Sequence, residues 1–341
     1  MPKIARKIVW LILIAALGSA SWFAWALLTP VEPPEHTFVM LHPGYSTRRI
    51  ASELKSAGVI RSEEAFMLWH YFHRRRSLKA GEYLFDKPAN IIDLQKRLRR
   101  GDVYVHTVVV PEGFTMFDIA RAVEAAGLGP AEDFLKVAQS DTALIADIAP
   151  GAPSLEGYLF PDTYEFSRMQ TMHDMAAVMV KQFRQVGAQI GLIPQPFSST
   201  PDSGRGLHNF VTMASIVEKE TAVAEERPLV ASVYYNRLAK NIALDADPSV
   251  IYAELLAGTY QGALHHADMQ FRSRYNTYKY PGLPPGPIGN PGKSALEAAL
   301  HPAASDYYYF VADAQGHHRF ARTIEEHNKN VASYRRAVRG K

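Results

Sequence analysis

The sequence of 341 residues contains no cysteine. Without a thiol the chain can form no disulfide bond, no thiolate nucleophile and no cysteine-ligated metal centre, so three classes of structure and chemistry are excluded together. A protein exported to an oxidising compartment can do without cysteine, because disulfides are frequent there but are not required.

Three frequent catalytic signatures are also missing. The sequence holds no His-Glu-x-x-His zinc motif, no phosphate-binding P-loop and no Gly-x-Ser-x-Gly nucleophile turn. Its histidine pairs, His265–His266 and His317–His318, are adjacent in sequence, so on regular structure the two rings of a pair point in different directions. We therefore expect neither a metal site nor a cofactor.

A large surplus of one charge is absent too. Lysine and arginine number 37 against 34 aspartate and glutamate residues, and the formal net charge is +3. Such a surplus predicts no nucleic-acid binding unless it is concentrated in a patch. The basic runs at 73–76, 96–100 and 334–336 are short, and we interpret them as solvated helix faces or ends. The alternative partner for these runs is an anionic polymer or a membrane surface.

One long uncharged run is present, at Ile8–Leu28. Its 21 residues, at about 1.5 Å rise per residue, can cross a hydrocarbon core of roughly 30 Å. Lys3, Arg6 and Lys7 precede it, so we expect residues 1–7 in the cytoplasm, 8–28 in the membrane and the rest outside. The alternative is a cleaved signal peptide ending at Ala24–Ala26, which we favour less because the apolar run is longer than a signal needs.

A structural unit occurs twice after this run. The stretch TFVMLHPGYSTRRIASELKSAGVI begins at Thr37, and HTVVVPEGFTMFDIARAVEAAGLG begins 69 residues later at His106. In each copy an apolar strand ends at a Gly turn, Ser or Thr can cap a helix, and a later glycine can end it. The matched positions are Gly44 and Gly113, Ser46 and Thr115, and Gly58 and Gly127. This pattern resembles the opening of LysM modules, which bind N-acetylglucosamine polymers.

The remaining sequence is rich in helix signals. Hydrophobic residues make up 47% of the chain, enough for two or three modest domains. We expect helices at 172–190, 208–222, 225–240, 248–257 and 294–300 and from 323 onward, an exposed loop at 195–206 and a strand at 307–311. The fold class is α+β, with an N-terminal transmembrane helix, a LysM-like subdomain at 36–105 and a larger helix-rich catalytic domain at 106–341 that includes the second repeat unit at 106–128.

The octapeptide ASIVEKET, Ala214–Thr221, carries two glutamates on a predicted amphipathic helix. On a helical wheel Glu218 and Glu220 fall about 80° to either side of the apolar stripe, so both lie at the border between core and solvent. A border position suits a general acid, because partial burial raises a carboxyl pKa while leaving the proton within reach of substrate. Helical periodicity does not choose between the two, although the small neighbours of Glu218 leave more room for a ligand. The alternative is a pair of surface glutamates.

A rigid loop with nine Pro or Gly in twelve residues, PGLPPGPIGNPG, spans 281–292 and follows Tyr275–Tyr280, which reads YNTYKY. Aromatic rings beside Asn and Thr suit a sugar site, because the rings cover the apolar faces of pyranoses and the polar groups bond their hydroxyls. The alternative is a polyproline ligand for another domain.

Together these stretches resemble the YceG-like family, the membrane-anchored endolytic murein transglycosylases. The matching motifs are EGYLFPDTY at 156–164, ASIVEKET, ERP at 226–228, VYYNRL at 233–238, DPSV at 247–250, YNTY at 275–278 with the Pro/Gly loop, and FVAD at 310–313. The sequence departs from the family at Asp245, where Gln is usual, and at Ser249, where Thr is usual.

The resemblance implies an enzyme that cleaves the β-1,4 bond between N-acetylmuramic acid and N-acetylglucosamine in nascent strands without water, leaving 1,6-anhydro ends and terminating elongation. It implies Glu218 as the general acid, which later acts as base. The residues expected to hold sugar or orient Glu218 are Asn236, Asp247, Asn276 and Tyr278, with Glu220 and Ser215 as supporting neighbours. It also implies a single-pass protein of the cell inner membrane, with its catalytic part in the periplasm or otherwise outside the cytoplasm.

Implied partners are peptidoglycan strands, the membrane and glycan-polymerising synthases, but no nucleic acid. Two alternatives stay open. The first is a hydrolytic muramidase with a second carboxylate, for which Glu156, Asp162 or Asp247 could serve. The second is a cell-wall-binding anchor without activity, whose repeated unit recruits partners.

Overall fold

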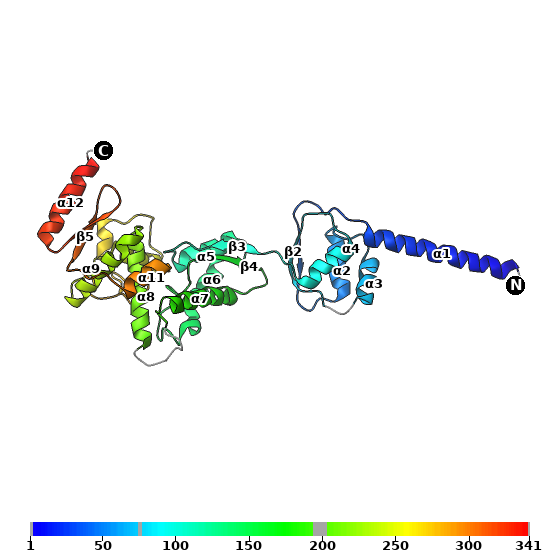
Figure 1. Ribbon diagram of the computed structural model, residues 1–341, viewed down its shortest axis with the longest axis horizontal. Coiled ribbons are helices and arrows are strands. Elements are labelled where there is room, and N and C mark those ends of the chain that lie inside the picture. Colours follow the sequence, from blue (N-terminus) through cyan, green and yellow to red (C-terminus); the bar gives the residue numbers. More distant parts are fainter. Residues whose placement is uncertain (1–2, 74–76, 194–202, 340–341) are drawn as a thin grey trace. The chain divides into compact units, whose positions relative to one another are not determined.

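The computed structural model describes residues 3–73, 77–193 and 203–339 (Figure 1). The chain divides into two compact units. The first comprises the residues up to His106 together with Glu165–Met169, and the second comprises Thr107–Tyr164 and the chain from Gln170 onward. The sequence did not predict that Glu165–Met169 joins the first unit. The fold is mixed α/β and mostly helical.

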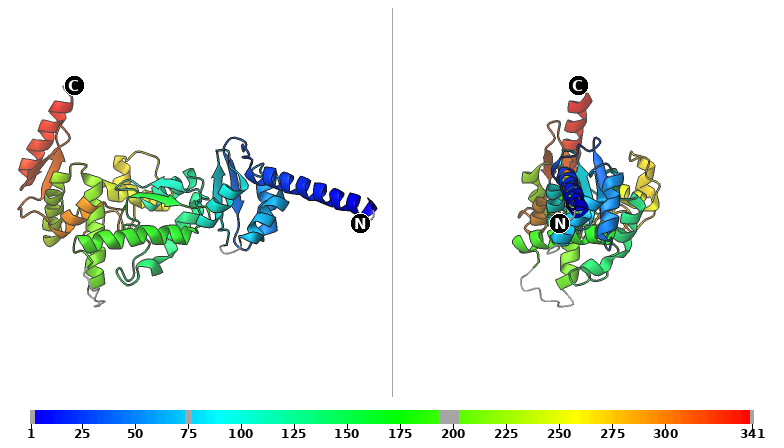
Figure 2. Two further views of the ribbon diagram at one scale, coloured as in Figure 1. Left: turned by 45° about the vertical axis from the view of Figure 1, so that its right-hand side comes forward. Right: turned by 90° about the vertical axis from the view of Figure 1, so that its right-hand side faces the viewer.

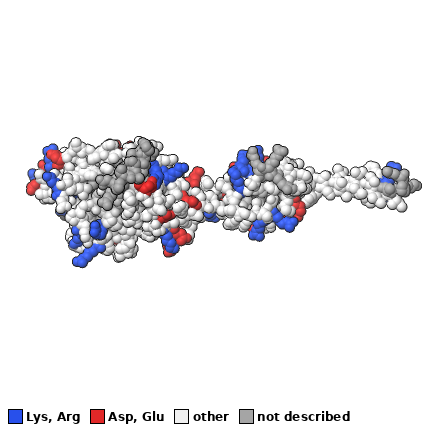
Figure 3. Space-filling view, turned by 90° about the horizontal axis from the view of Figure 1, so that it is seen from below, with Lys and Arg blue, Asp and Glu red and all other residues white. Residues whose placement is uncertain are grey.

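The helix α1, Lys3–Leu28, is apolar over most of its length. Within it Arg6–Leu28 is long and apolar enough to cross a membrane, and no other helix in the described part of the chain meets both conditions. Basic side chains on α1 are confined to its N-terminal turns, and the rest of its surface is uncharged (Figure 3). The predicted apolar span at 8–28 therefore coincides with a helix.

The first unit is built on a two-stranded sheet. Strands β1, Thr37–Leu41, and β2, Gly81–Phe85, are antiparallel, with Val39 opposite Tyr83. The helices that pack on them are α2, Thr47–Ser56, α3, Glu63–Phe72, and α4, Ile91–Arg100. Their apolar side chains form one core, which also includes the last turn of α1.

The two copies of the repeated unit have the predicted structure. Helix α5, Met116–Ala125, lies 69 residues after α2 at both of its ends (47 to 116 and 56 to 125). Ser46 caps α2 and Thr115 caps α5, each by accepting a hydrogen bond from the third helical N–H. Gly58 and Gly127 both follow the helix with φ of 72°, a conformation that favours glycine.

The second unit is helix-rich (Figure 2), and two further two-stranded sheets are found among the described residues. Strand β3, His106–Val109, pairs with β4, Thr163–Phe166, and β5, Tyr309–Ala312, pairs with β6, His318–Ala321. Beside α5, its helices are α6 (Ala131–Ser140), α7 (Met172–Gln189), α8 (Ser203–Glu220), α9 (Arg227–Ala239), α10 (Asp247–Ala257), α11 (Lys293–Leu300) and α12 (Ile324–Arg339). Helix α8 packs against α9, α10 and α11.

Six expected elements, α7 and α9 to α12 with β5, are confirmed to within two residues at each end, apart from the C-terminal end of α12, for which no end was predicted. The start of α8 was predicted wrongly. The helix begins at Ser203, so residues 203–206 of the expected loop are helical, and residues 195–202 of that loop lie outside the described part of the chain. A Gly-rich, Ser-rich opening favours a loop locally, and the apolar face that begins at Leu207 outweighs this preference.

Candidate active site

Helix α8 carries both glutamates in its last turn. From Val211 to Val217 it is buried on every side, because α9, α10 and α11 surround it. A fully buried helix has no polar face, which explains why the wheel could not separate Glu218 from Glu220. Both carboxyls lie at the negative end of the helix dipole, which disfavours an anion and raises a carboxyl pKa.

Glu218 lies in a buried ion pair. Its Oε1 accepts a hydrogen bond from Nη2 of Arg227 at 2.7 Å, and its Oε2 accepts one from the backbone N–H of Gly292 at 2.9 Å. The side chains of Glu218 and Arg227 are only 5% and 7% exposed. Burial raises the pKa of Glu218, while the Gly292 N–H and Arg227 act to lower it. The net shift of the Glu218 pKa is upward, and the ion pair satisfies a buried arginine whose Nη1 also lies 3.7 Å from Oε2 of Glu112.

Glu220 lies in a different environment. It lines a cavity of about 330 Å³, and no ion pair to it is found among the described residues. Burial raises the pKa of Glu220 to about 7, the Tyr234 hydroxyl acts to lower it, and the charge of Asp247 raises it further. A carboxyl with a pKa of about 7 is about half protonated at neutral pH, so it can give up or take a proton there.

The same cavity contains two of the residues predicted to hold sugar. Tyr278 donates a hydrogen bond from its hydroxyl to Oδ1 of Asp247 at 2.6 Å, and both side chains line the cavity with Glu220. Asp247 begins α10, with Pro248 at the first turn. The wall is completed by Tyr234, Arg237, Leu244, Asp245, Tyr309, Phe310, Ile324 and His327. A carboxylic acid, a carboxylate and several aromatic rings around one space are suited to binding and cleaving a glycosidic bond.

Asp245, at which the sequence departs from the family, also lies in this cavity. Its Oδ2 accepts a hydrogen bond from Nη2 of Arg237 at 2.8 Å, and Arg237 Nη1 donates to the backbone oxygen of Leu244. The φ of Asp245 is 53°, which is a strained conformation for a residue other than glycine. Arg237 therefore holds the turn that delivers Asp247 to the cavity.

Three other predicted residues have structural roles. The amide nitrogen of Asn236 donates to the backbone oxygens of Ser305 and Tyr307, both at 2.9 Å. Asn276 is fully buried, and its amide is bonded to the backbone of Met269, Phe271 and Tyr278. The amide donors of both asparagines are already engaged by backbone oxygens, and their predicted contact with sugar stays a prediction. Asn276 positions the chain that carries Tyr278.

Ser215 is buried as well, and its hydroxyl accepts a hydrogen bond from the N–H of Ile288 at 3.0 Å while donating to Thr212. This contact ties the Pro/Gly loop to α8. Ser215 thus supports the helix that carries both glutamates, but it does not line the cavity.

Sequence reasoning missed the residue that organises the Pro/Gly loop. Asn290 is fully buried. Its Oδ1 accepts from the N–H groups of Gly157 and Leu159 at 2.8 and 2.9 Å, and its Nδ2 donates to Phe114 O and to Glu156 Oε1 at 2.9 and 2.7 Å. The available signal was a lone polar residue inside a Pro/Gly run, which is a common place for a side chain that caps loops.

Glu156 and Asp162, considered as second carboxylates, lie outside the cavity of Glu220. Glu156 is fully buried and accepts hydrogen bonds from Met116 N and Asn290. Burial raises the pKa of Glu156 to about 8. Asp162 accepts from Gln182 Nε2 at 2.8 Å and from Thr163 N. Of the three candidates, only Asp247 shares a cavity with a glutamate of ASIVEKET.

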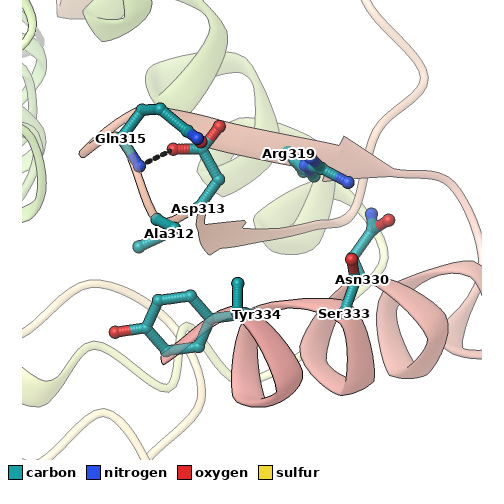
Figure 4. A pocket seen from close by; sticks show the side chains of 9 residues that line it. Ala312, Asp313, Gln315, Arg319, Asn330, Ser333 and Tyr334 are labelled. Carbon is teal, nitrogen blue, oxygen red and sulfur yellow. Dashed lines mark hydrogen bonds between the residues drawn. The ribbon is translucent and has the colours of Figure 1, made fainter. Parts of the chain in front are cut away.

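Other cavities lie among the described residues of the second unit, and two of them adjoin elements named above. One, of about 510 Å³, is lined by Lys219 and Pro248, the chain neighbours of Glu220 and Asp247, and by Arg121, Tyr252 and Tyr260 among others. The other is small, about 80 Å³, between the β5–β6 turn and α12. There Asp313 accepts a hydrogen bond from the N–H of Gln315 and so closes the turn (Figure 4). Within the described residues, no group of three or more His, Asp or Glu side chains could hold a metal ion.

Comparisons with known proteins show which family the chain belongs to. The model of the YceG-like family matches residues 39–333. The chain is 34% identical over 336 residues to an endolytic murein transglycosylase of Bacillus subtilis (strain 168), an alignment that covers 93% of this chain and 91% of that relative. It is 29% identical over 364 residues to an endolytic murein transglycosylase of Streptococcus pneumoniae (strain D39), covering 97% of this chain and 65% of the relative.

A solved structure is similar as well. It is a 2.6 Å crystal structure of a yceG-like protein from Listeria monocytogenes. The TM-score is 0.57 at 34% identity, and the match covers 86% of this chain and 99% of that one.

The replacement Asn290→Ala tests the loop anchor. It removes partners from two buried N–H groups, so we expect the free energy of unfolding to fall by at least about 3 kcal/mol, measured by denaturant unfolding. Asn328→Ala, at an exposed position of α12, is the control and should stay within about 0.5 kcal/mol of wild type. Equal stabilities of the two variants would contradict the role assigned to Asn290.

Proposed function

Because the chain belongs to the YceG-like family, we propose that it is an endolytic lytic transglycosylase of murein in which Glu220 is the general acid. The observation that carries the proposal is the position of the Glu220 carboxyl, which faces the same cavity as Asp247 and Tyr278 and has a pKa raised to about 7. The substrate is the peptidoglycan strand, and the bond is the β-1,4 bond between N-acetylmuramic acid and N-acetylglucosamine.

The proposed mechanism uses one carboxyl twice. Protonated Glu220 gives its proton to the glycosidic oxygen, and the bond between that oxygen and C1 of the muramic acid breaks. The C6 hydroxyl of the same sugar attacks C1, and its proton passes to the Glu220 carboxylate, which restores the acid and leaves a 1,6-anhydro end. An internal nucleophile has a high effective molarity, so no second nucleophilic carboxylate is needed.

Asp247 has an electrostatic role in this mechanism. Its carboxylate lies in the cavity with Glu220 and accepts a hydrogen bond from Tyr278. A fixed negative charge stabilises the positive charge that develops at C1 and at the ring oxygen. It also raises the pKa of Glu220, which keeps the acid protonated.

The family resemblance favours Glu218 as the acid, and that assignment stays a prediction. The geometry favours Glu220 instead, since Glu218 is joined to Arg227 and Gly292. We propose that Glu218 is structural, holding Arg227 and the end of the Pro/Gly loop in place.

The proposal includes the placement of the chain. With basic residues only at the N-terminal end of α1 and none in its last turn, we propose that the N-terminus is cytoplasmic and that both units are outside. Such a protein would lie in the inner membrane and act on nascent strands close to glycan-polymerising synthases. We also propose that the LysM-like first unit contacts the glycan, which binding of purified strands to a chain with Glu220→Gln would test.

The matched pair Glu220→Gln and Glu218→Gln separates the two glutamates. For Glu220→Gln we expect a folded protein with turnover lowered by about 10²–10⁴-fold, the usual contribution of a general acid. For Glu218→Gln we expect mainly lower stability, because buried Arg227 loses its counter-charge. Both variants are measured for turnover of isolated strands and for thermal unfolding. The assignment would be reversed if Glu218→Gln lost activity at normal stability while Glu220→Gln kept normal activity.

A second prediction concerns pH. Glu220 acts as acid only while protonated, so kcat/KM should fall as pH rises through about 7. Asp247→Asn removes a negative charge that raises this pKa, so the midpoint of the fall should move to lower pH. Asp162→Asn, outside the cavity, should leave the midpoint unchanged. A midpoint near the ordinary glutamate pKa in wild type, or an unmoved midpoint in Asp247→Asn, would be evidence against Glu220.

The reaction products distinguish a lytic transglycosylase from a hydrolytic muramidase. Mass spectrometry of digested peptidoglycan should detect 1,6-anhydro ends. Reducing ends that carry the full added water would instead identify a hydrolytic muramidase, with Asp247 as the second carboxylate. Strands that bind but are never shortened by wild-type protein would identify a cell-wall anchor without activity.

A further inference from the structure

Helix α1 ends inside the core of the first unit and not in a free linker. Ala26 and Leu27 are buried there, and Phe23 packs against the same core. The guanidinium of Arg61 lies 5.1 Å from the ring centre of Trp25, and its Nη2 donates to the backbone oxygen of Pro30 at 3.1 Å. The part of the first unit beside these contacts must therefore meet the surface of any membrane that α1 crosses.

Helix α3 lies beside this point and presents an apolar face to solvent. It contacts α1, and Figures 1 and 2 show it on the side of the first unit from which α1 extends. Ala65 and Phe66 face the core. Leu68, Tyr71 and Phe72, spaced as i, i+3 and i+4 and so on one face, are 44%, 58% and 70% exposed.

From these positions we infer that α3 is a second membrane contact, with Leu68, Tyr71 and Phe72 inserted in the interfacial layer of the bilayer that α1 enters. The occupant of the exposed face is lipid because α3 contacts α1, whose own apolar surface is exposed and includes Trp22 and Trp25, each about half exposed. Aromatic and aliphatic side chains at the level of the headgroups are stabilised by burial in the acyl boundary.

The charges agree with a lipid partner. Arg61 is exposed and is fixed over Trp25 at the end of the span, where an anionic headgroup can pair with it. The acidic residues of α3, Glu63 and Glu64, are at its opposite end from Phe72. When both α1 and α3 contact the bilayer, two contacts instead of one restrict the orientation of the first unit relative to the membrane.

The absence of cysteine makes a direct test simple, because each single-cysteine variant of the full chain carries one spin label. Leu68→Cys, Tyr71→Cys and Phe72→Cys are labelled in lipid nanodiscs of phosphatidylethanolamine and phosphatidylglycerol. Val105→Cys, an exposed apolar position outside α1 and α3, is the matched control. Collision of the label with oxygen, which concentrates in the bilayer, is compared with collision with a water-soluble nickel chelate.

We expect the ratio of oxygen to nickel collisions at 68, 71 and 72 to exceed that at 105 several-fold. A ratio equal to that at 105 would show that α3 faces water, and labels shielded from both reagents would show that a protein, such as a second copy of this chain, covers the face. Either result would overturn the inference. All three positions are exposed, so cysteine should not unfold the unit, and thermal unfolding of each labelled variant checks this.

Discussion

The four side-chain hydrogen bonds of Asn290 are the interaction on which the site depends. They join the Pro/Gly loop to the turn before α5 and to the turn at Gly157. Gly157 has a φ of 88°, and an added Cβ would meet Pro287, so the two loops are packed backbone against side chain. With the loop fixed in this way, its N–H groups at Ile288 and Gly292 reach Ser215 and Glu218 on α8.

That clamp gives two nearly adjacent glutamates different environments. Burial raises the pKa of Glu218, and a buried cation and an N–H group act against that rise. Glu220 faces the cavity with Asp247, where burial and a like charge favour the neutral acid. In the mechanism proposed above Glu220 gives the proton and Glu218 holds structure, although their sequence neighbourhoods are almost the same.

This difference marks the limit of what the sequence could predict. The repeat, its caps and most helices followed from local signals, since capping by Ser46 or Thr115 and termination at Gly58 or Gly127 depend on residues within one turn. The choice between the glutamates depends on Arg227 and Asp247, which come from other helices. The hydrophobic pattern of α8 does not show which residues of other helices lie beside each glutamate. Because α8 is buried on every side, it also has no polar face that the pattern could indicate.

The two asparagines show the same limit of prediction from sequence. Asn276 was expected to bind sugar because an amide beside aromatic residues suits that role, and Asn236 was a further candidate, yet both donate to backbone oxygens. In a site made of loops with little regular structure, many backbone groups lack partners, and buried amides are the side chains that can satisfy both donors and acceptors. Tyr278 and Asp247 remain at the cavity wall, and tertiary packing decides which polar side chains stay there.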